Sequence, residues 1–192
     1  MKIEKILLNV LAVQKVGVTC IPKTQELDHP VISFSGTQNL RHVLSYDLNF
    51  LEAEWAPKGK AHSGFVKRSI KLIDEIEYFI KENDDFILSG HSLGGAVAVL
   101  CASRITTNGK NVAGVYTFGT PKIGNEDFRE YYVDQNLWEK TKNYVTPRDF
   151  VKKLPPFIYK NIGDEIELYS SERNLLKSHD IKTYSNFFHN FS

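Results

Sequence analysis

The stretch FILSGHSLGGAVAVL, residues 86–100, joins an apolar run to an alanine-rich run through a turn that is rich in glycine. The short apolar run before Gly90 is typical of a buried parallel strand. The nearly continuous apolar run after Gly94 is typical of a buried helix. Ser92 is at the centre of the turn between them. The stretch therefore predicts a strand, a tight turn and a helix, with one hydroxyl group held at the turn.

Gly90 and Gly94 stand two residues before and two residues after Ser92. Side chains at these two positions would collide with the neighbouring strand and helix if the turn were sharp enough to project Ser92 Oγ above a sheet. The helix also directs its free N–H groups and the positive end of its dipole to the same point. We predict a nucleophile elbow in which Ser92 is the nucleophile and the Leu93 N–H is an oxyanion donor. The alternative is a glycine-rich turn without chemistry.

The rest of the chain alternates apolar segments with glycine and proline, which is typical of alternating strands and helices. We expect a single compact α/β domain, residues 1–192, with a central, mostly parallel sheet and helices on both of its faces. An apolar residue recurs at spacings of three and four from Val66 to Ile80, which predicts one helix over residues 65–81 with this stripe in the core. A second helix is expected over residues 126–136. The expected strands are 31–36, 85–90, 112–119, 141–145 and 164–170.

The amino-acid composition of the chain limits its expected partners and its expected location. The 192 residues carry 24 Lys and Arg against 23 Asp and Glu, so no global positive field exists to hold a nucleic acid. No stretch approaches the roughly 20 apolar residues of a membrane span. The two cysteines are too few for a disulfide scaffold, and the apolar run near the N-terminus is interrupted. We therefore expect a cytoplasmic location, with secretion as the alternative.

A serine nucleophile needs a histidine base, and in an elbow fold the base follows the nucleophile and the acid along the chain. Only His179 and His189 follow Ser92. His189 is close to the C-terminus, where fraying is the default. His179 follows the last predicted strand, and we predict that it is the base. The histidines His62 and His91 are expected to make structural hydrogen bonds beside the site instead.

The candidate acid is Asp149, which follows the predicted strand 141–145 and so belongs to a loop at the carboxyl edge of the sheet. Three other carboxylates fit less well, because two fall in the helix 126–136 and one in a turn: Asp127, Asp134 and Asp164. Asp149 is also two residues after Pro147, where a turn-forming aspartate is common. The residues alone leave both interpretations of Asp149 open.

Several segments together resemble the class 3 lipase family of the α/β hydrolases. VISFSGT resembles the oxyanion strand and loop of that family, AHSGF its His-x-Gly-Phe, GHSLGGAVA its elbow, YTFGTPKIGN its Tyr-x-Phe-Gly-x-Pro-x-x-Gly-Asn, and RDFVKKLPP its acid loop. The similarity spans residues 31–184. It departs from the family pattern at Ser35, where an arginine is usual, and in an acid loop without the common Asp-Pro-Val. The chain is also shorter than typical members.

The resemblance implies an α/β-hydrolase fold and a catalytic triad of Ser92, Asp149 and His179. It implies that Thr37 is the second oxyanion residue beside Leu93. Acyl transfer through serine needs no cofactor, and the sequence shows no cluster of metal ligands, so we expect neither a cofactor nor a metal.

The substrate class depends on residues 38–55, where the family resembled here keeps a lid. Leu40, Val43 and Leu44 fall on one helical face. A lid helix that turns this face towards lipid would give contact with a lipid–water interface, whereas an ordinary packed helix is the alternative. We predict a serine carboxylester hydrolase, favouring an acylglycerol lipase over a small-ester, phospholipid or feruloyl esterase. The alternative from another class is a catalytically silent lipid-binding or interaction module.

Overall fold

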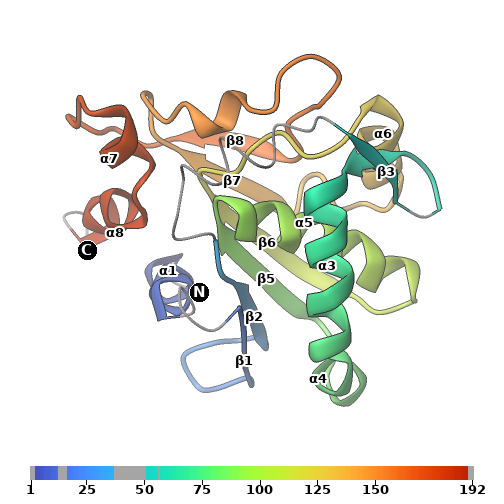
Figure 1. Ribbon diagram of the computed structural model, residues 1–192. Coiled ribbons are helices and arrows are strands. Elements are labelled where there is room, and N and C mark those ends of the chain that lie inside the picture. The colour runs from blue at the N-terminus through green and yellow to red at the C-terminus, as the bar shows by residue number, and fades with distance from the viewer. Residues whose placement is uncertain (1–2, 13–16, 37–50, 56, 190–192) are drawn as a thin grey trace.

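The computed structural model describes residues 3–12, 17–36, 51–55 and 57–189, and for His189 the backbone alone (Figure 1). Six strands form the central sheet in the order β1-β2-β5-β6-β7-β8. β1 pairs antiparallel with β2, and every other pair is parallel. The strands are β1 (Val18–Ile21), β2 (Val31–Phe34), β5 (Phe86–His91), β6 (Val112–Phe118), β7 (Thr141–Val145) and β8 (Asp164–Glu167). Each of the five predicted strands is thus present, and its ends lie within three residues of the predicted ends.

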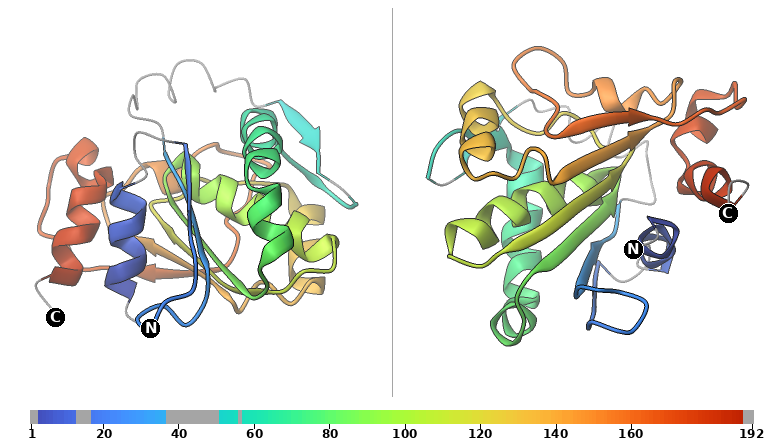
Figure 2. Two further views of the ribbon diagram at one scale, coloured as in Figure 1. Left: turned by 90° about the horizontal axis from the view of Figure 1, so that it is seen from below. Right: turned by 180° about the vertical axis from the view of Figure 1, so that it is seen from behind.

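Helices cover both faces of this sheet, as Figure 2 shows from below. One face is covered by α3 (Ser63–Glu75) and α5 (Leu93–Thr107), and the other by α1 (Ile3–Ala12) and α8 (Ile181–His189). Adjacent residues of β5 pack on opposite faces of the sheet. Its Leu88 packs in the cluster with α5, whereas Ile87 packs in a cluster with α1. Because both faces are buried, β5 carries no alternation of polar and apolar residues.

The remaining elements surround this core. A two-stranded sheet of β3 (Glu52–Glu54) and β4 (Lys60–His62) precedes α3, and neither strand was expected from the sequence. α6 (Glu126–Asp134) lies within the predicted helix 126–136. Shorter elements complete the chain: α4 (Glu77–Glu82), the 3-10 helix η2 (Val151–Lys153) and α7 (Leu175–His179).

The helix predicted over residues 65–81 is wrong in two respects. It is divided at Ile76 into α3 and α4, and Ile70, which the predicted stripe placed in the core, is 46% exposed. The buried face of α3 instead includes Phe65 and Ser69. The serine is fully buried, on the face of α3 that packs against α5. Only the packing partner reveals that this small polar residue, and not Ile70, is on the inner face.

Candidate active site

Ser92 lies at the turn between β5 and α5, as predicted. Its φ of 56° and ψ of −126° place it in a region that residues with a side chain rarely adopt. Its N–H donates to the carbonyl of Phe118 on the adjacent strand β6, and its own carbonyl accepts from the N–H groups of Gly95 and Ala96. These three hydrogen bonds hold the strained backbone, and with it the position of the hydroxyl group.

The two elbow glycines are required by close packing. A Cβ on Gly90 would overlap the backbone of Gly94, and a Cβ on Gly94 would overlap the carbonyl oxygen of Phe34 at the end of β2. Backbone atoms cannot move away as a flexible side chain can. The structure therefore places Gly90 and Gly94 where the sequence argument for an elbow needs glycine.

Asp149 lies on the loop after β7 and is almost fully buried. Its Oδ1 accepts a hydrogen bond from the N–H of Val151 at 2.9 Å, and its own N–H donates to Thr146 O. The other oxygen, Oδ2, is 2.7 Å from Nδ1 of His179. The carboxylate is thus held on one side by the backbone and directed on the other side at a histidine.

His179 is the last residue of α7 and is fully buried. With Nδ1–H donating to Asp149, the second ring nitrogen Nε2 carries the free lone pair. Within the described part of the chain, this Nε2 is buried and has no hydrogen-bond partner. An oriented imidazole with an unused basic nitrogen is the arrangement that a general base requires.

Two further residues of this cluster, Gly119 and Tyr184, were not identified from the sequence. The Tyr184 hydroxyl donates to Asp149 Oδ2 at 2.5 Å. Burial and the nearby carboxylate raise the pKa of Tyr184 well above its usual value, so the donor stays protonated. Gly119 has φ of 56°, and a Cβ there would lie 2.5 Å from Asp149 Oδ2 and 3.1 Å from His179 Nδ1. A side chain at position 119 would separate the two partners.

The family model described as Lipase (class 3) matches residues 31–159, which is more than half of the chain. The chain belongs to the class 3 lipase family. The predicted resemblance is thereby confirmed.

Individual relatives support the same family assignment. The lipase of Rhizomucor miehei is 29% identical over 148 residues, which are 70% of this chain and 40% of that protein. The secreted mono- and diacylglycerol lipase LIP1 of Malassezia globosa is 30% identical over 149 residues, 67% of this chain and 49% of that protein. The chain thus spans less than half the length of these two relatives.

A solved structure supports the same relationship. It is that of a triacylglycerol lipase whose catalytic centre is formed by a serine protease triad. It matches with a TM-score of 0.64 at 28% identity and covers 73% of this chain and 57% of that one. This confirms the predicted α/β-hydrolase fold class.

His91, the residue before Ser92 in this family member, makes a structural hydrogen bond as expected. Its Nε2–H donates to the backbone carbonyl of His179 at 2.7 Å, and the two rings lie 4.7 Å apart. Burial, and next the neighbouring His179 ring, lower the pKa of His91 well below its usual value. The second expected structural histidine, His62, caps α3 by accepting from the N–H of Gly64. Neither side chain replaces His179.

The neutral His91 predicts a pH-dependent stability. An unfolded histidine binds a proton below its ordinary pKa of 6.5, whereas the buried His91 does not, so the unfolded state gains protons and stability falls as the pH falls. Between about pH 7.5 and about pH 5, this single group should cost about 2 kcal/mol of unfolding free energy. We expect the fall in unfolding free energy between these two pH values, measured by urea unfolding, to be smaller by that amount in His91→Gln. The side-chain amide of the glutamine can still donate to the His179 carbonyl. Equal losses in the two proteins would contradict this role.

The oxyanion residues are described only in part. Leu93 is the first residue of α5, where a backbone N–H has no partner within the helix. Thr37 and residues 38–50 of the predicted lid segment lie outside the described residues. At the end of that segment, Glu52–Glu54 is strand β3, and Trp55 is buried in the core beneath the guanidinium of Arg104. Trp55 therefore packs within the protein.

The other carboxylates considered as acids lie elsewhere. Asp127 and Asp134 are on α6, and Asp164 on β8 accepts from Lys142 and from the indole of Trp138. His189 ends α8. Over the described ranges, no group of three or more potential metal ligands occurs, and no helix is long and apolar enough to cross a membrane.

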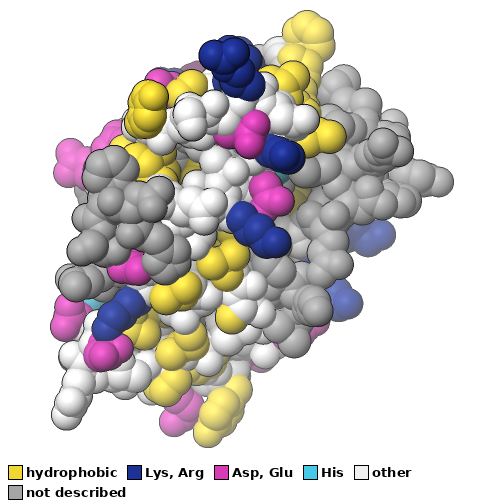
Figure 3. All heavy atoms as spheres, turned by 90° about the vertical axis from the view of Figure 1, so that its left-hand side faces the viewer, with side chains coloured by type: hydrophobic (Ala, Val, Ile, Leu, Met, Phe, Trp, Pro, Cys, Tyr) yellow, Lys and Arg dark blue, Asp and Glu magenta, His cyan; other side chains and the backbone are white. Residues whose placement is uncertain are grey.

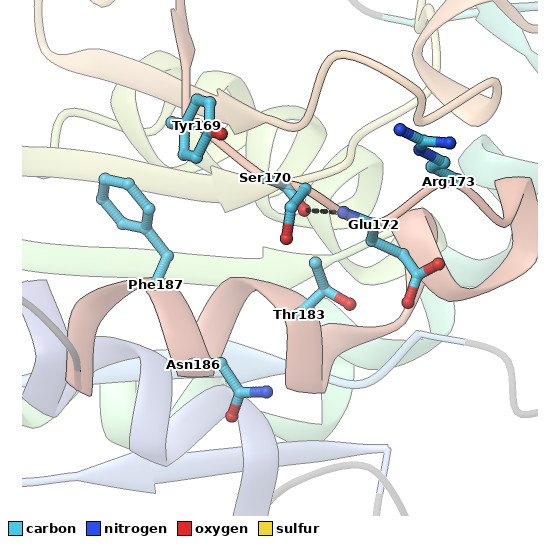
Figure 4. A pocket seen from close by; sticks show the side chains of 8 residues that line it. Tyr169, Ser170, Glu172, Arg173, Thr183, Asn186 and Phe187 are labelled. Atoms are coloured by element: carbon cyan, nitrogen blue, oxygen red, sulfur yellow. Dashed lines mark hydrogen bonds between the residues drawn. The ribbon is translucent and has the colours of Figure 1, made fainter.

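A cavity of about 640 Å³ lies between residues 169–173 and α8, with Tyr169 and Phe187 at one end and Arg173 at the other (Figure 4). None of the three predicted triad residues lines it. The surrounding face, which includes α1, α7 and α8, mixes apolar side chains with charges of both signs (Figure 3).

Proposed function

We propose that this chain is a serine carboxylester hydrolase that cleaves acylglycerol esters through an acyl-enzyme intermediate. The observation that carries the proposal is the buried His179–Asp149 hydrogen bond of 2.7 Å, in a fold that also holds Ser92 at a strained strand-to-helix turn. Membership of a lipase family supports the substrate class. A cytoplasmic location stays a prediction.

In the proposed mechanism, Ser92 Oγ attacks the ester carbonyl carbon while His179 Nε2 takes its proton. The carbonyl oxygen becomes an oxyanion, bound by the Leu93 N–H and by the N–H of Thr37. His179 then returns the proton to the departing alcohol oxygen as the carbon–oxygen bond breaks, which leaves the acyl group on Ser92. Water repeats the sequence with the same base and releases a carboxylic acid. Asp149 holds the imidazole tautomer and stabilises the imidazolium throughout.

The reaction is tested with a panel of substrates and one covalent probe. Purified protein is incubated with p-nitrophenyl esters from acetate to palmitate, with emulsified triacylglycerol and with phosphatidylcholine vesicles, and separately with a fluorophosphonate. We expect ester hydrolysis, preference for acylglycerol over phospholipid, and labelling of Ser92 identified by mass spectrometry. Faster release of fatty acid from phosphatidylcholine would instead favour a phospholipase. No turnover of any substrate together with no labelling would overturn the proposal and favour a catalytically silent binding module.

A further inference from the structure

The end of β2 lies directly against the nucleophile elbow. Ser35, the first residue after β2, is buried, and its N–H donates to the carbonyl of Gly17. A Cβ on Gly94 would lie 2.8 Å from the Ser35 carbonyl oxygen, so this carbonyl packs on the first turn of α5. The residue after Ser35 is equally close, because a Cβ on Gly36 would lie 2.8 Å from His91 O and 3.5 Å from Ser92 Cβ. A shift of this segment would therefore be felt at the nucleophile.

Arg68 on α3 holds Ser35 from the other side. Its Nη2 donates to Ser35 Oγ at 3.0 Å and is 3.5 Å from Ser35 O. The second distance is at the limit of a hydrogen bond, so the hydroxyl is the stronger partner. Two contacts in series thus join the guanidinium to the elbow, from Arg68 to Ser35 and from Ser35 to Gly94.

The environment of Arg68 is unusual for an arginine. The side chain is half-buried, and burial lowers the pKa of the guanidinium. Among the described residues, no carboxylate forms an ion pair with it, and its Nε is buried without a hydrogen-bond partner. An arginine stays protonated even when partly desolvated. Its Nη2 is therefore directed at the oxygen atoms of Ser35, and among the described residues Glu75 acts on the guanidinium only through a Coulombic interaction that raises its pKa, without an ion-pair contact.

We propose that Arg68 is a positioning residue for ester hydrolysis, which fixes the end of β2 against the elbow by binding Ser35. The proposal rests on the proposed hydrolase function. The oxyanion donors must be in place before charge develops, and a displacement of about 1 Å in an active site costs on the order of 100-fold in rate. Loss of the Arg68–Ser35 contact should therefore lower kcat, while KM, which reflects binding of the rest of the substrate, changes little.

The test compares Arg68→Ser with the exchanged pair Ser35→Arg/Arg68→Ser, which places the guanidinium at position 35 instead. Lys67→Gln is the matched control, since it removes an exposed positive charge from the same helix. For each protein, kcat and KM on a short-chain p-nitrophenyl ester, the rate of fluorophosphonate labelling and the melting temperature are measured. We expect Arg68→Ser to lower kcat and the labelling rate by roughly 10- to 100-fold with KM within about twofold. In the exchanged pair, kcat and the labelling rate should be about tenfold or more above those of Arg68→Ser. Lys67→Gln should have the kcat, KM and labelling rate of the wild type.

The outcomes separate the two proposals. If the wild type is active and Arg68→Ser keeps its kcat, Arg68 has no positioning role while the hydrolase function stands. A loss of kcat that only parallels a fall in melting temperature, and that the exchanged pair does not recover, assigns Arg68 to general stability and also overturns the proposal. If the wild type itself neither hydrolyses esters nor reacts with the probe, the hydrolase function fails, and the role of Arg68 fails with it.

Discussion

Replacing Ser92 with alanine should reduce ester turnover by about 10⁵-fold or more, and it should abolish labelling by a fluorophosphonate. The hydroxyl group is the atom that forms the acyl-enzyme, so no neighbouring group can take its place. The fold should survive, because the side chain shrinks by one oxygen and the backbone hydrogen bonds of Ser92 do not involve it. Turnover is measured on the ester panel, and folding by melting temperature.

The matched control for this change is Ser171→Ala, which alters an exposed serine away from the elbow. It should leave both turnover and labelling unchanged. Undiminished turnover in Ser92→Ala, with the protein still folded, would show that another group carries the reaction.

Replacing His179 with alanine should be about as damaging as replacing Ser92, because a nucleophile and its base act as a unit. Asp149→Asn should cost about 10⁴-fold, since the amide cannot hold the tautomer that leaves Nε2 free. Both are measured as kcat/KM at constant pH, with circular dichroism to show that the variants fold. Removal of an imidazole next to the buried Asp149 carboxylate also lowers stability, so melting temperatures are recorded with the rates.

His189→Ala is the comparison that decides the assignment of the base. It should keep nearly full activity. If His189→Ala abolished turnover and His179→Ala did not, the assignment of His179 would be wrong.

The local features of the elbow were predictable from the sequence because they depend on the backbone conformation of a few adjacent residues. A short apolar run, a serine between two glycines and an apolar helix leave few other conformations for residues 86–100. The order of residues along the chain then reduced the candidate bases to two. Five of the six strands of the sheet were predicted from short runs that end at turns, whereas β1 was not predicted. For these features, the information is contained in segments no longer than the elements themselves.

Contacts between distant segments were decided only by the tertiary structure. The residues around Asp149 left a turn role open, and only the family resemblance implied that it is the acid; the fold then shows its Oδ2 2.7 Å from Nδ1 of His179, which is thirty residues away in the chain. Gly119 and Tyr184 gave no signal of their own, because their importance consists in what they touch. The single helix expected over residues 65–81 failed for the same reason, since its inner face is chosen by α5 and not by the spacing of isoleucines.

The contrast is sharpest at Ser35 and Arg68. The sequence contains Ser35 and Arg68, but it cannot show that the guanidinium donates to the serine hydroxyl, because the two residues are thirty-three positions apart. Local sequence determines the conformation of the backbone at an elbow, since steric exclusion acts between adjacent residues. The partners of a buried polar group are determined by which elements the whole core brings together, and for this protein only the three-dimensional packing of α3 on α5 and β2 supplies them.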